Sequence, residues 1–179
     1  MPPSIRPAEL ADLPAIVELY NHYVRSTAAT FEIAEVRPED KSGWFHEHGA
    51  SGPHRMLVAV DAAGGVIGWA TTSPFRPRAA YRTTVESSIY LHPVAVGRGV
   101  GSQLYGALFD SIRNEDLERI VAGISLPNPG SVALHRRFGF QPVGVFTRVG
   151  RKFDRYWDVA WFERPLRLPA PAPPRAPTP

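Results

Sequence analysis

Apolar residues along the chain recur at two different spacings, which together predict a mixture of helices and strands. After Asp12, which we expect to cap a helix, apolar positions recur every three or four residues and predict one buried helical face. This face consists of Ile16, Leu19, Tyr20 and Tyr23. Further helices are predicted at 38–48, with Trp44 and Phe45 facing inward, at about 103–113 and at 131–138.

Short apolar runs bounded by glycine, proline or aspartate are typical of strands. The runs at 56–60 and 66–70 are joined by Asp-Ala-Ala-Gly-Gly, which predicts a hairpin. The other predicted strands are 5–7, 84–94, 120–125, 143–146 and 157–162. Strands and helices therefore alternate through one α/β domain, which we place at residues 4–166.

A glycine-rich turn, Gly-Arg-Gly-Val-Gly-Ser, lies between the predicted strand 84–94 and an amphipathic helix. Backbone N–H groups at such a helix start lack partners, and the helix dipole favours anions there. The turn therefore predicts a site for the phosphates of a cofactor, although it fits neither a Walker loop nor a dinucleotide fingerprint and could be a plain connector. The candidate contacts are Gly97, Arg98, Gly99, Val100, Gly101 and Ser102.

Composition narrows the class of protein. The 179 residues are 44% hydrophobic and 21% charged, which is typical of a globular domain. There is no cysteine, so thiolate metal sites and cysteine nucleophiles are excluded. No apolar run approaches the roughly 20 residues that span a bilayer, and the N-terminus does not resemble a signal peptide. We therefore expect a cytoplasmic protein with no membrane contact.

The net charge of +3 is not concentrated in a dense basic run, so we do not expect nucleic-acid binding. From Pro165 onward the chain is rich in proline and alanine. We expect residues 167–179 to be a disordered or polyproline-like tail.

The order of elements and several motifs resemble the GNAT superfamily of acyl-CoA-dependent N-acetyltransferases. The turn at 97–102 resembles its pyrophosphate-binding element, although Val96 stands where the family has Gln or Arg. The segments 126–135 and 138–140 resemble its second cofactor element. Residues 80–90 and 157–159 resemble the phosphinothricin N-acetyltransferase group. The resemblance covers about residues 4–166.

This resemblance implies a fold and a cofactor. The expected fold is a central mixed, mostly antiparallel, splayed sheet flanked by helices, and the expected co-substrate is acetyl-CoA. The main chain of Ile89, Tyr90 and Leu91 should pair with the pantetheine arm. Asn128 either contacts the pantetheine or simply caps the helix that follows it.

The resemblance also implies two catalytic residues. Glu86 is the candidate general base, because a carboxylate on an interior strand should have its pKa raised by desolvation. The alternative is an exposed glutamate or one paired with Arg78 or Arg82. His135 stands where many relatives have a tyrosine that donates a proton to the CoA sulfur. Its alternative is a histidine on a surface helix.

Acceptor binding is assigned to a loop and one aromatic residue. Arg76, Arg78 and Tyr81 precede Glu86, and in the phosphinothricin group this loop contacts acidic groups of the substrate. Phe31 resembles a wall of the substrate pocket, with core packing as the alternative. The histidines lack metal-ligand spacing, so we expect no metal.

The sequence thus predicts transfer of acetyl from acetyl-CoA to the α-amine of a small amino acid or analogue, such as phosphinothricin, methionine sulfoximine or methionine sulfone. Direct attack in a ternary complex is expected, with a homodimer formed through 143–146 and the C-terminal strand. The alternatives are another amine, such as a protein N-terminus or polyamine, or a non-catalytic acyl-CoA-binding module.

Overall fold

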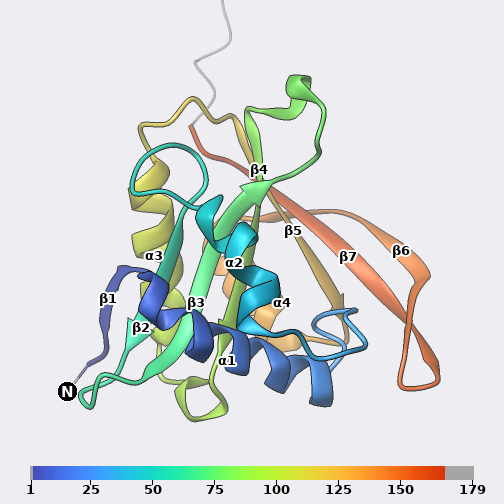
Figure 1. Ribbon diagram of the computed structural model, residues 1–179. Helices are drawn as coiled ribbons and strands as arrows, with labels where there is room; N and C mark the ends of the chain where they lie inside the picture. The colour runs from blue at the N-terminus through green and yellow to red at the C-terminus, as the bar shows by residue number, and fades with distance from the viewer. Residues whose placement is uncertain (1, 168–179) are drawn as a thin grey trace, which may run out of the picture.

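A seven-stranded sheet forms the centre of the computed structural model, which describes residues 2–167 (Figure 1). The strand order is β1-β2-β3-β4-β5-β7-β6, and the described strands pair antiparallel except for β4 with β5. This is the mixed, mostly antiparallel sheet that was predicted. The strands are β1 (Ser4–Pro7), β2 (Met56–Val60), β3 (Val66–Pro74), β4 (Thr84–Leu91), β5 (Arg119–Leu126), β6 (Gln141–Lys152) and β7 (Arg155–Pro165). The proposed tail, 167–179, lies outside the described residues except for Arg167.

Helices cover both faces of the sheet because alternate strand residues point in opposite directions. Val58 and Trp69 pack in one cluster with α1 (Leu13–Ser26) and α2 (Pro38–His46). Their neighbours Ala59 and Ala70 pack in a second cluster with α3 (Val100–Ile112) and residues next to α4 (Pro129–Arg137). We refer to the two sides as the α1/α2 face and the α3/α4 face.

The sheet splits between β4 and β5. These strands pair only over Thr84–Glu86 and Arg119–Val121, and both continue for five residues beyond the last pair. On its other side β4 stays paired with β3 as far as Leu91. The splayed sheet is therefore present, and the split begins directly after Glu86.

Several predicted element boundaries were wrong. Strand β4 ends at Leu91 rather than 94, because Pro93 begins a 3-10 turn over Pro93–Ala95. Helix α2 ends at His46 rather than 48, and α4 begins at Pro129 because proline suits the first turn of a helix. Strands β6 and β7 are each longer than predicted.

The capping role predicted for Asp12 was also wrong. Asp12 lies at the N-cap of α1, but its carboxylate makes no capping hydrogen bond to that helix within the described structure. The carboxylate instead accepts two hydrogen bonds from Arg6, at 2.6 and 2.8 Å, and one from the Glu9 N–H. Asp12 therefore ties β1 to the helix entry.

The hairpin of β6 and β7 projects to one side of the helices (Figure 1). Its tip contacts the loop between α1 and α2: buried Lys152 donates from Nζ to the Thr30 carbonyl at 2.9 Å. Phe31 packs against Gly150, where a Cβ atom would overlap its ring. No helix in the described residues is long and apolar enough to cross a membrane.

Candidate active site

The split between β4 and β5 holds a narrow cavity of about 60 Å³. Its walls come from both strands, including Ile89 and Ser125, and from α4 through His135. Glu86 shares the α1/α2 face with Ser88 and Tyr90, whereas His135 packs into the core of the α3/α4 face. The two predicted catalytic residues therefore flank the split from opposite sides of the sheet.

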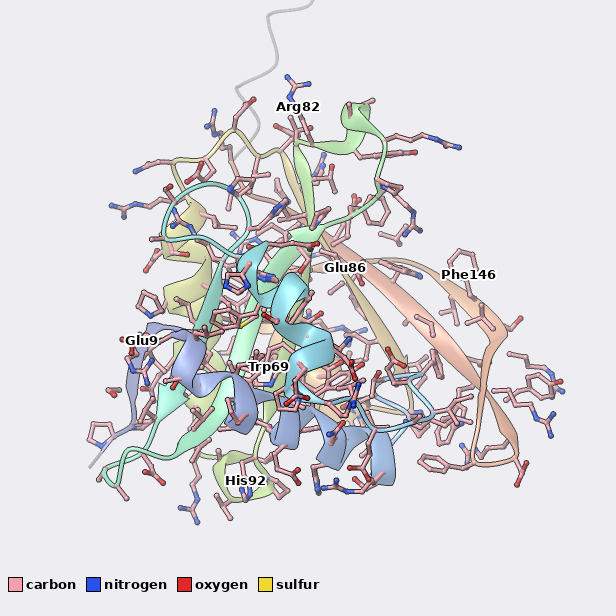
Figure 2. All side chains as sticks on the ribbon, viewed as in Figure 1. Glu9, Trp69, Arg82, Glu86, His92 and Phe146 are labelled. Atoms are coloured by element: carbon pink, nitrogen blue, oxygen red, sulfur yellow. The ribbon has the colours of Figure 1, made fainter. Side chains whose placement is uncertain are left out.

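Glu86 lines a larger cavity of about 380 Å³ on the α1/α2 side. Phe31, Trp161 and Phe146 form much of its wall, and Figure 2 shows Glu86 between Trp69 and the loop that carries Arg82. Burial raises the pKa of Glu86, and the nearby positive charge of Arg76 opposes this rise. Glu86 is thus half-buried and forms no salt bridge with any residue of 2–167, and a raised pKa suits it to proton removal near neutral pH.

A third cavity, of about 540 Å³, adjoins the Glu86 cavity, since Phe146 and Trp161 line both. Arg76 and Tyr81 line it together with Phe75. The Arg76 guanidinium lies 4.4 Å from the Phe75 ring centre and 6.0 Å from that of Trp161. The structure therefore brings two of the three predicted loop residues to one cavity, whereas exposed Arg78 lines neither of these two cavities.

His135 is buried, with 3% of its surface exposed, so the alternative of a surface histidine was wrong. Its Nδ1 lies 2.7 Å from the Ser131 carbonyl oxygen, which can only accept, so Nδ1 carries a proton. Its Nε2, in the neutral ring, accepts from the Tyr105 hydroxyl at 2.9 Å. Burial lowers the pKa of His135, which favours this neutral form.

Tyr105 connects the imidazole to the split in the sheet. Its hydroxyl also lies 3.5 Å from the Ser87 Oγ, and both residues line the 60 Å³ cavity. The α3/α4 side of the split therefore presents a hydrogen-bonded series of Ser87, Tyr105 and His135.

The glycine-rich turn adopts the conformation that its sequence predicts. Gly97 and Gly99 have φ angles of 76° and 80°, a region that favours glycine, and Gly99 is the N-cap of α3. No described side chain caps this helix, so its first N–H groups point outward without a side-chain acceptor. Gly101 is buried against Leu134 and Leu91, which places the helix start beside the split. These features fit a bound diphosphate, with exposed Arg98 and half-buried Ser102 beside it.

Among the remaining predicted cofactor contacts, Asn128 and Leu91 have hydrogen-bond partners within the protein. Asn128 caps α4 by accepting from the Ser131 N–H at 3.1 Å, and it also lines the 60 Å³ cavity, so both of its expected roles fit the geometry. The Leu91 carbonyl accepts from the Tyr23 hydroxyl at 2.6 Å, and that hydroxyl accepts from the Leu91 N–H at 3.3 Å. Ile89 and Tyr90 line the cavity directly.

Comparison with known proteins decides the family. The sequence model of the acetyltransferase (GNAT) domain matches residues 5–161. The chain belongs to the GNAT acetyltransferase family. Like its relatives it is an acetyl-CoA-dependent N-acetyltransferase, and no group of three or more His, Asp or Glu side chains within residues 2–167 is arranged to hold a metal ion.

Individual relatives are also similar over nearly their whole length. A phosphinothricin N-acetyltransferase from Streptomyces coelicolor is 51% identical over 163 residues, which cover 90% of this chain and 95% of the relative. An L-methionine sulfoximine/L-methionine sulfone acetyltransferase from Pseudomonas paraeruginosa is 39% identical over 163 residues, covering 91% and 94%. The crystal structure of a GNAT phosphinothricin acetyltransferase from Sinorhizobium meliloti with acetyl-CoA superimposes with a TM-score of 0.86 at 37% identity, covering 92% and 89%.

The candidate site also contains residues that the sequence did not reveal. Tyr105 lies in a helix whose apolar spacing indicates only core packing, and Trp161 lies in a strand that the sequence assigns only to the sheet. Tyr23 belongs to the predicted buried face of α1, yet its hydroxyl reaches β4. For Tyr105 and Tyr23 the available signal was a hydroxyl group on a residue of an apolar helical face, because a buried hydroxyl requires a hydrogen-bond partner.

Proposed function

We propose that this enzyme acetylates the α-amine of a small amino acid or analogue that carries an acidic or strongly polar side chain. The observation that carries the proposal is the position of Glu86, half-buried at the point where β4 and β5 separate and facing a cavity that adjoins the one lined by Arg76. The relatives that act on phosphinothricin and on methionine sulfoximine or sulfone support this class of acceptor.

Arg76 and Tyr81 are the proposed contacts to the acceptor's carboxylate or phosphinate oxygens. A guanidinium matches such oxygens with two parallel hydrogen bonds, and Trp161 and Phe75 hold the Arg76 side chain in place. Arg78 lies two residues further along the same loop and adds positive charge. A polyamine or basic N-terminus would be repelled by these cations, so we favour an acidic acceptor.

The chemistry follows from the two faces of the split. Acetyl-CoA supplies the activated acetyl group when it is bound. Glu86 removes a proton from the acceptor's ammonium group, directly or through water, so that the neutral amine can attack in a ternary complex. On the opposite face, we assign the protonation of the departing sulfur to His135 together with Tyr105. The Tyr105 hydroxyl lies between the imidazole and Ser87.

A thiol-release assay tests this proposal. Wild type, Glu86→Gln and His135→Ala are incubated with acetyl-CoA and either phosphinothricin, methionine sulfoximine, methionine sulfone, a peptide N-terminus or spermidine. We expect turnover with the first three acceptors, and slower turnover in both variants while CoA affinity by calorimetry persists. Faster turnover with spermidine or the peptide would refute the acceptor assignment. Coenzyme A binding with no turnover of any amine would instead indicate a binding module.

We further propose that the enzyme is a homodimer that forms through the β6–β7 hairpin. Phe146 is 58% exposed and stands at the outer edge of the molecule in Figure 2, and Val143, Val145 and Val149 are also exposed. A second copy would cover this apolar surface. We expect Val145→Lys to convert a dimer into a monomer in sedimentation, whereas a wild-type monomer would refute the proposal.

We also propose a cytoplasmic location for the enzyme, because acetyl-CoA is a cytoplasmic metabolite.

A further inference from the structure

A second cavity on the α1/α2 face lies directly beside Glu86 and is not used by the proposed acceptor site. It has a volume of about 170 Å³ and lies under α2, between α1 and the strands β3 and β4. Ser73 and Ser88 supply hydroxyl groups to its wall. Ser88 lies two residues from Glu86 on the same face of β4, and Ser73 is the strand partner of Glu86 across the β3–β4 ladder.

The register places Ser73 and Glu86 within reach of one bridging water. Directly paired residues of antiparallel strands point to the same face, with Cβ atoms about 4.5–5.5 Å apart. Both residues share this face with Trp69, which lies in the cluster packed against α1 and α2. The cavity wall therefore includes Ser73, the strand partner of Glu86, and Ser88, which lies two residues from Glu86 on the same face.

An unpaired polar group makes this cavity a suitable site for water. Trp69 lines the cavity and is 3% exposed, and its indole N–H has no hydrogen-bond partner among residues 2–167. Leaving a buried donor unpaired is costly, whereas a cavity with polar walls and more than about 15 Å³ of accessible space can hold a water molecule. A water here would accept from the indole and bond to the serine hydroxyls.

His48 is the last group in this series of hydrogen bonds, on the side of Ser73 away from Glu86. Its Nδ1 lies 2.9 Å from the Trp44 carbonyl, so Nδ1 carries a proton, and its Nε2 accepts from the Ser73 hydroxyl at 3.2 Å. The Ser73 oxygen thus keeps its lone pairs for a donor on the Glu86 side. His48 is half-buried just beyond the end of α2, so it contacts Ser73 of the cavity wall and is also accessible to solvent.

We propose that Ser73 and His48 form the proton exit of the enzyme, carrying the proton that Glu86 takes from the acceptor through cavity water to solvent. This inference rests on the proposed role of Glu86. The acceptor nitrogen begins as an ammonium and ends as an amide, so it loses two protons. One proton ends on the sulfur, which receives the electron pair of the broken carbon–sulfur bond, and the other must leave the site. A bound acceptor fills the cavity on the open side of Glu86, which leaves the serine-lined side as the way out.

The charged groups near Glu86 and His48 favour proton transfer from Glu86 toward His48. Burial lowers the pKa of His48, as does the neighbouring His54, whereas Glu47 raises it. An imidazole that receives a proton from Ser73 therefore passes it on readily to water. Arg76 lies near Glu86, Lys41 lines the cavity, and exposed His46 on α2 bonds to the Ser42 carbonyl.

His48→Gln is the main test, because glutamine can keep both hydrogen bonds but cannot carry a proton. His46→Gln is the matched control, since His46 bonds to the Ser42 carbonyl at 2.6 Å on the same helix. We expect His48→Gln to lower kcat about tenfold at neutral pH, less than the loss of a primary base, with the acceptor KM within about twofold of wild type. Added imidazole should restore turnover, and Ser73→Ala should resemble His48→Gln.

Unchanged kcat and pH profile in His48→Gln would overturn the proposal. A lower melting temperature together with a raised acceptor KM, without rescue by imidazole, would also overturn it, because that result indicates only a structural role for His48.

Titration of His48 by NMR in the protein alone provides a readout that does not depend on turnover. Ser73→Ala removes a donor to the neutral ring and should raise the His48 midpoint, and Glu86→Gln removes a nearby negative charge and should lower it. Midpoints that stay fixed in both variants would refute the connection. If wild type acetylates none of the acceptors, the proposed function fails instead, and the Glu86→Gln titration alone decides whether His48 is coupled to Glu86.

Discussion

Replacing Glu86 by glutamine removes the proposed base while keeping the size and shape of the side chain. A positioned general base contributes about 10²–10⁴-fold to a rate. The cavity of about 380 Å³ next to Glu86 is large enough for water to replace part of this role. We therefore expect kcat to fall about 100-fold, which corresponds to about 2.7 kcal/mol in the activation free energy.

The raised pKa of Glu86 also predicts how the activity depends on pH. Burial raises the pKa of Glu86, and only the ionised form accepts a proton, so wild-type activity should rise as pH increases through this raised pKa. The variant should lack that acidic limb. Steady-state thiol release between about pH 5 and pH 9, with CoA affinity measured separately, provides the assay.

Stability should change in the opposite direction to activity. The folded protein binds the Glu86 proton more tightly than the unfolded chain, so the ionised carboxylate destabilises the fold at neutral pH. This cost disappears as pH falls through the raised pKa. Glu86→Gln should therefore melt at the same temperature as wild type or higher at pH 7, with no gain at acidic pH. Exposed Glu118→Gln is the control, and a Glu86→Gln enzyme with wild-type kcat would refute the role of the carboxylate.

Three further substitutions test the acceptor and cofactor sites. Arg76→Ala should raise the acceptor KM about tenfold or more, and because Arg76 lowers the pKa of the base, it should move the acidic limb to higher pH; an unmoved limb would contradict this contact. Gly150→Ala should displace the Phe31 ring that packs on Gly150, which raises the acceptor KM and lowers the free energy of unfolding by about 1–3 kcal/mol. A Cβ atom at Gly144 in the same strand meets no atom within 4 Å, so Gly144→Ala should leave the melting temperature unchanged. Gly99→Ala forces a residue with a Cβ into a φ of 80° and should weaken CoA binding in calorimetry, whereas Gly106→Ala within α3 should leave CoA affinity intact; equal affinities in both variants would refute the role of the turn.

Local patterns in the sequence predicted much of the fold. The hairpin of β2 and β3, the helical face of α1 and the glycine turn each depend on residues close together in the chain. The lengths of β6 and β7 were not predictable in this way, because the register shifts between Phe146 and Gly150 and Arg148 adopts a positive φ. An irregular ladder interrupts the alternation by which strands are recognised.

The site was predictable only in its separate parts. The strand position of Glu86 and the helix that carries His135 follow from the sequence and the family resemblance. The partners of these residues do not, because the Tyr105–His135 bond joins residues 30 apart and the Lys152–Thr30 bond joins residues 122 apart. Such pairs depend on tertiary packing, which no local pattern encodes. The same holds for Trp161, which became a cavity wall only once β7 lay beside β5.

The short ladder between β4 and β5 has a consequence for how the enzyme meets its two ligands. Three paired residues on each strand hold β4 and β5 together. Beyond them the strands separate, so the sheet divides the two faces of the molecule and is open between β4 and β5. The proposed amino-acid acceptor and the nucleotide end of the acyl donor can therefore approach from opposite faces of the sheet without passing one another. Neither needs to enter first, and random-order kinetics is the behaviour expected of such an architecture.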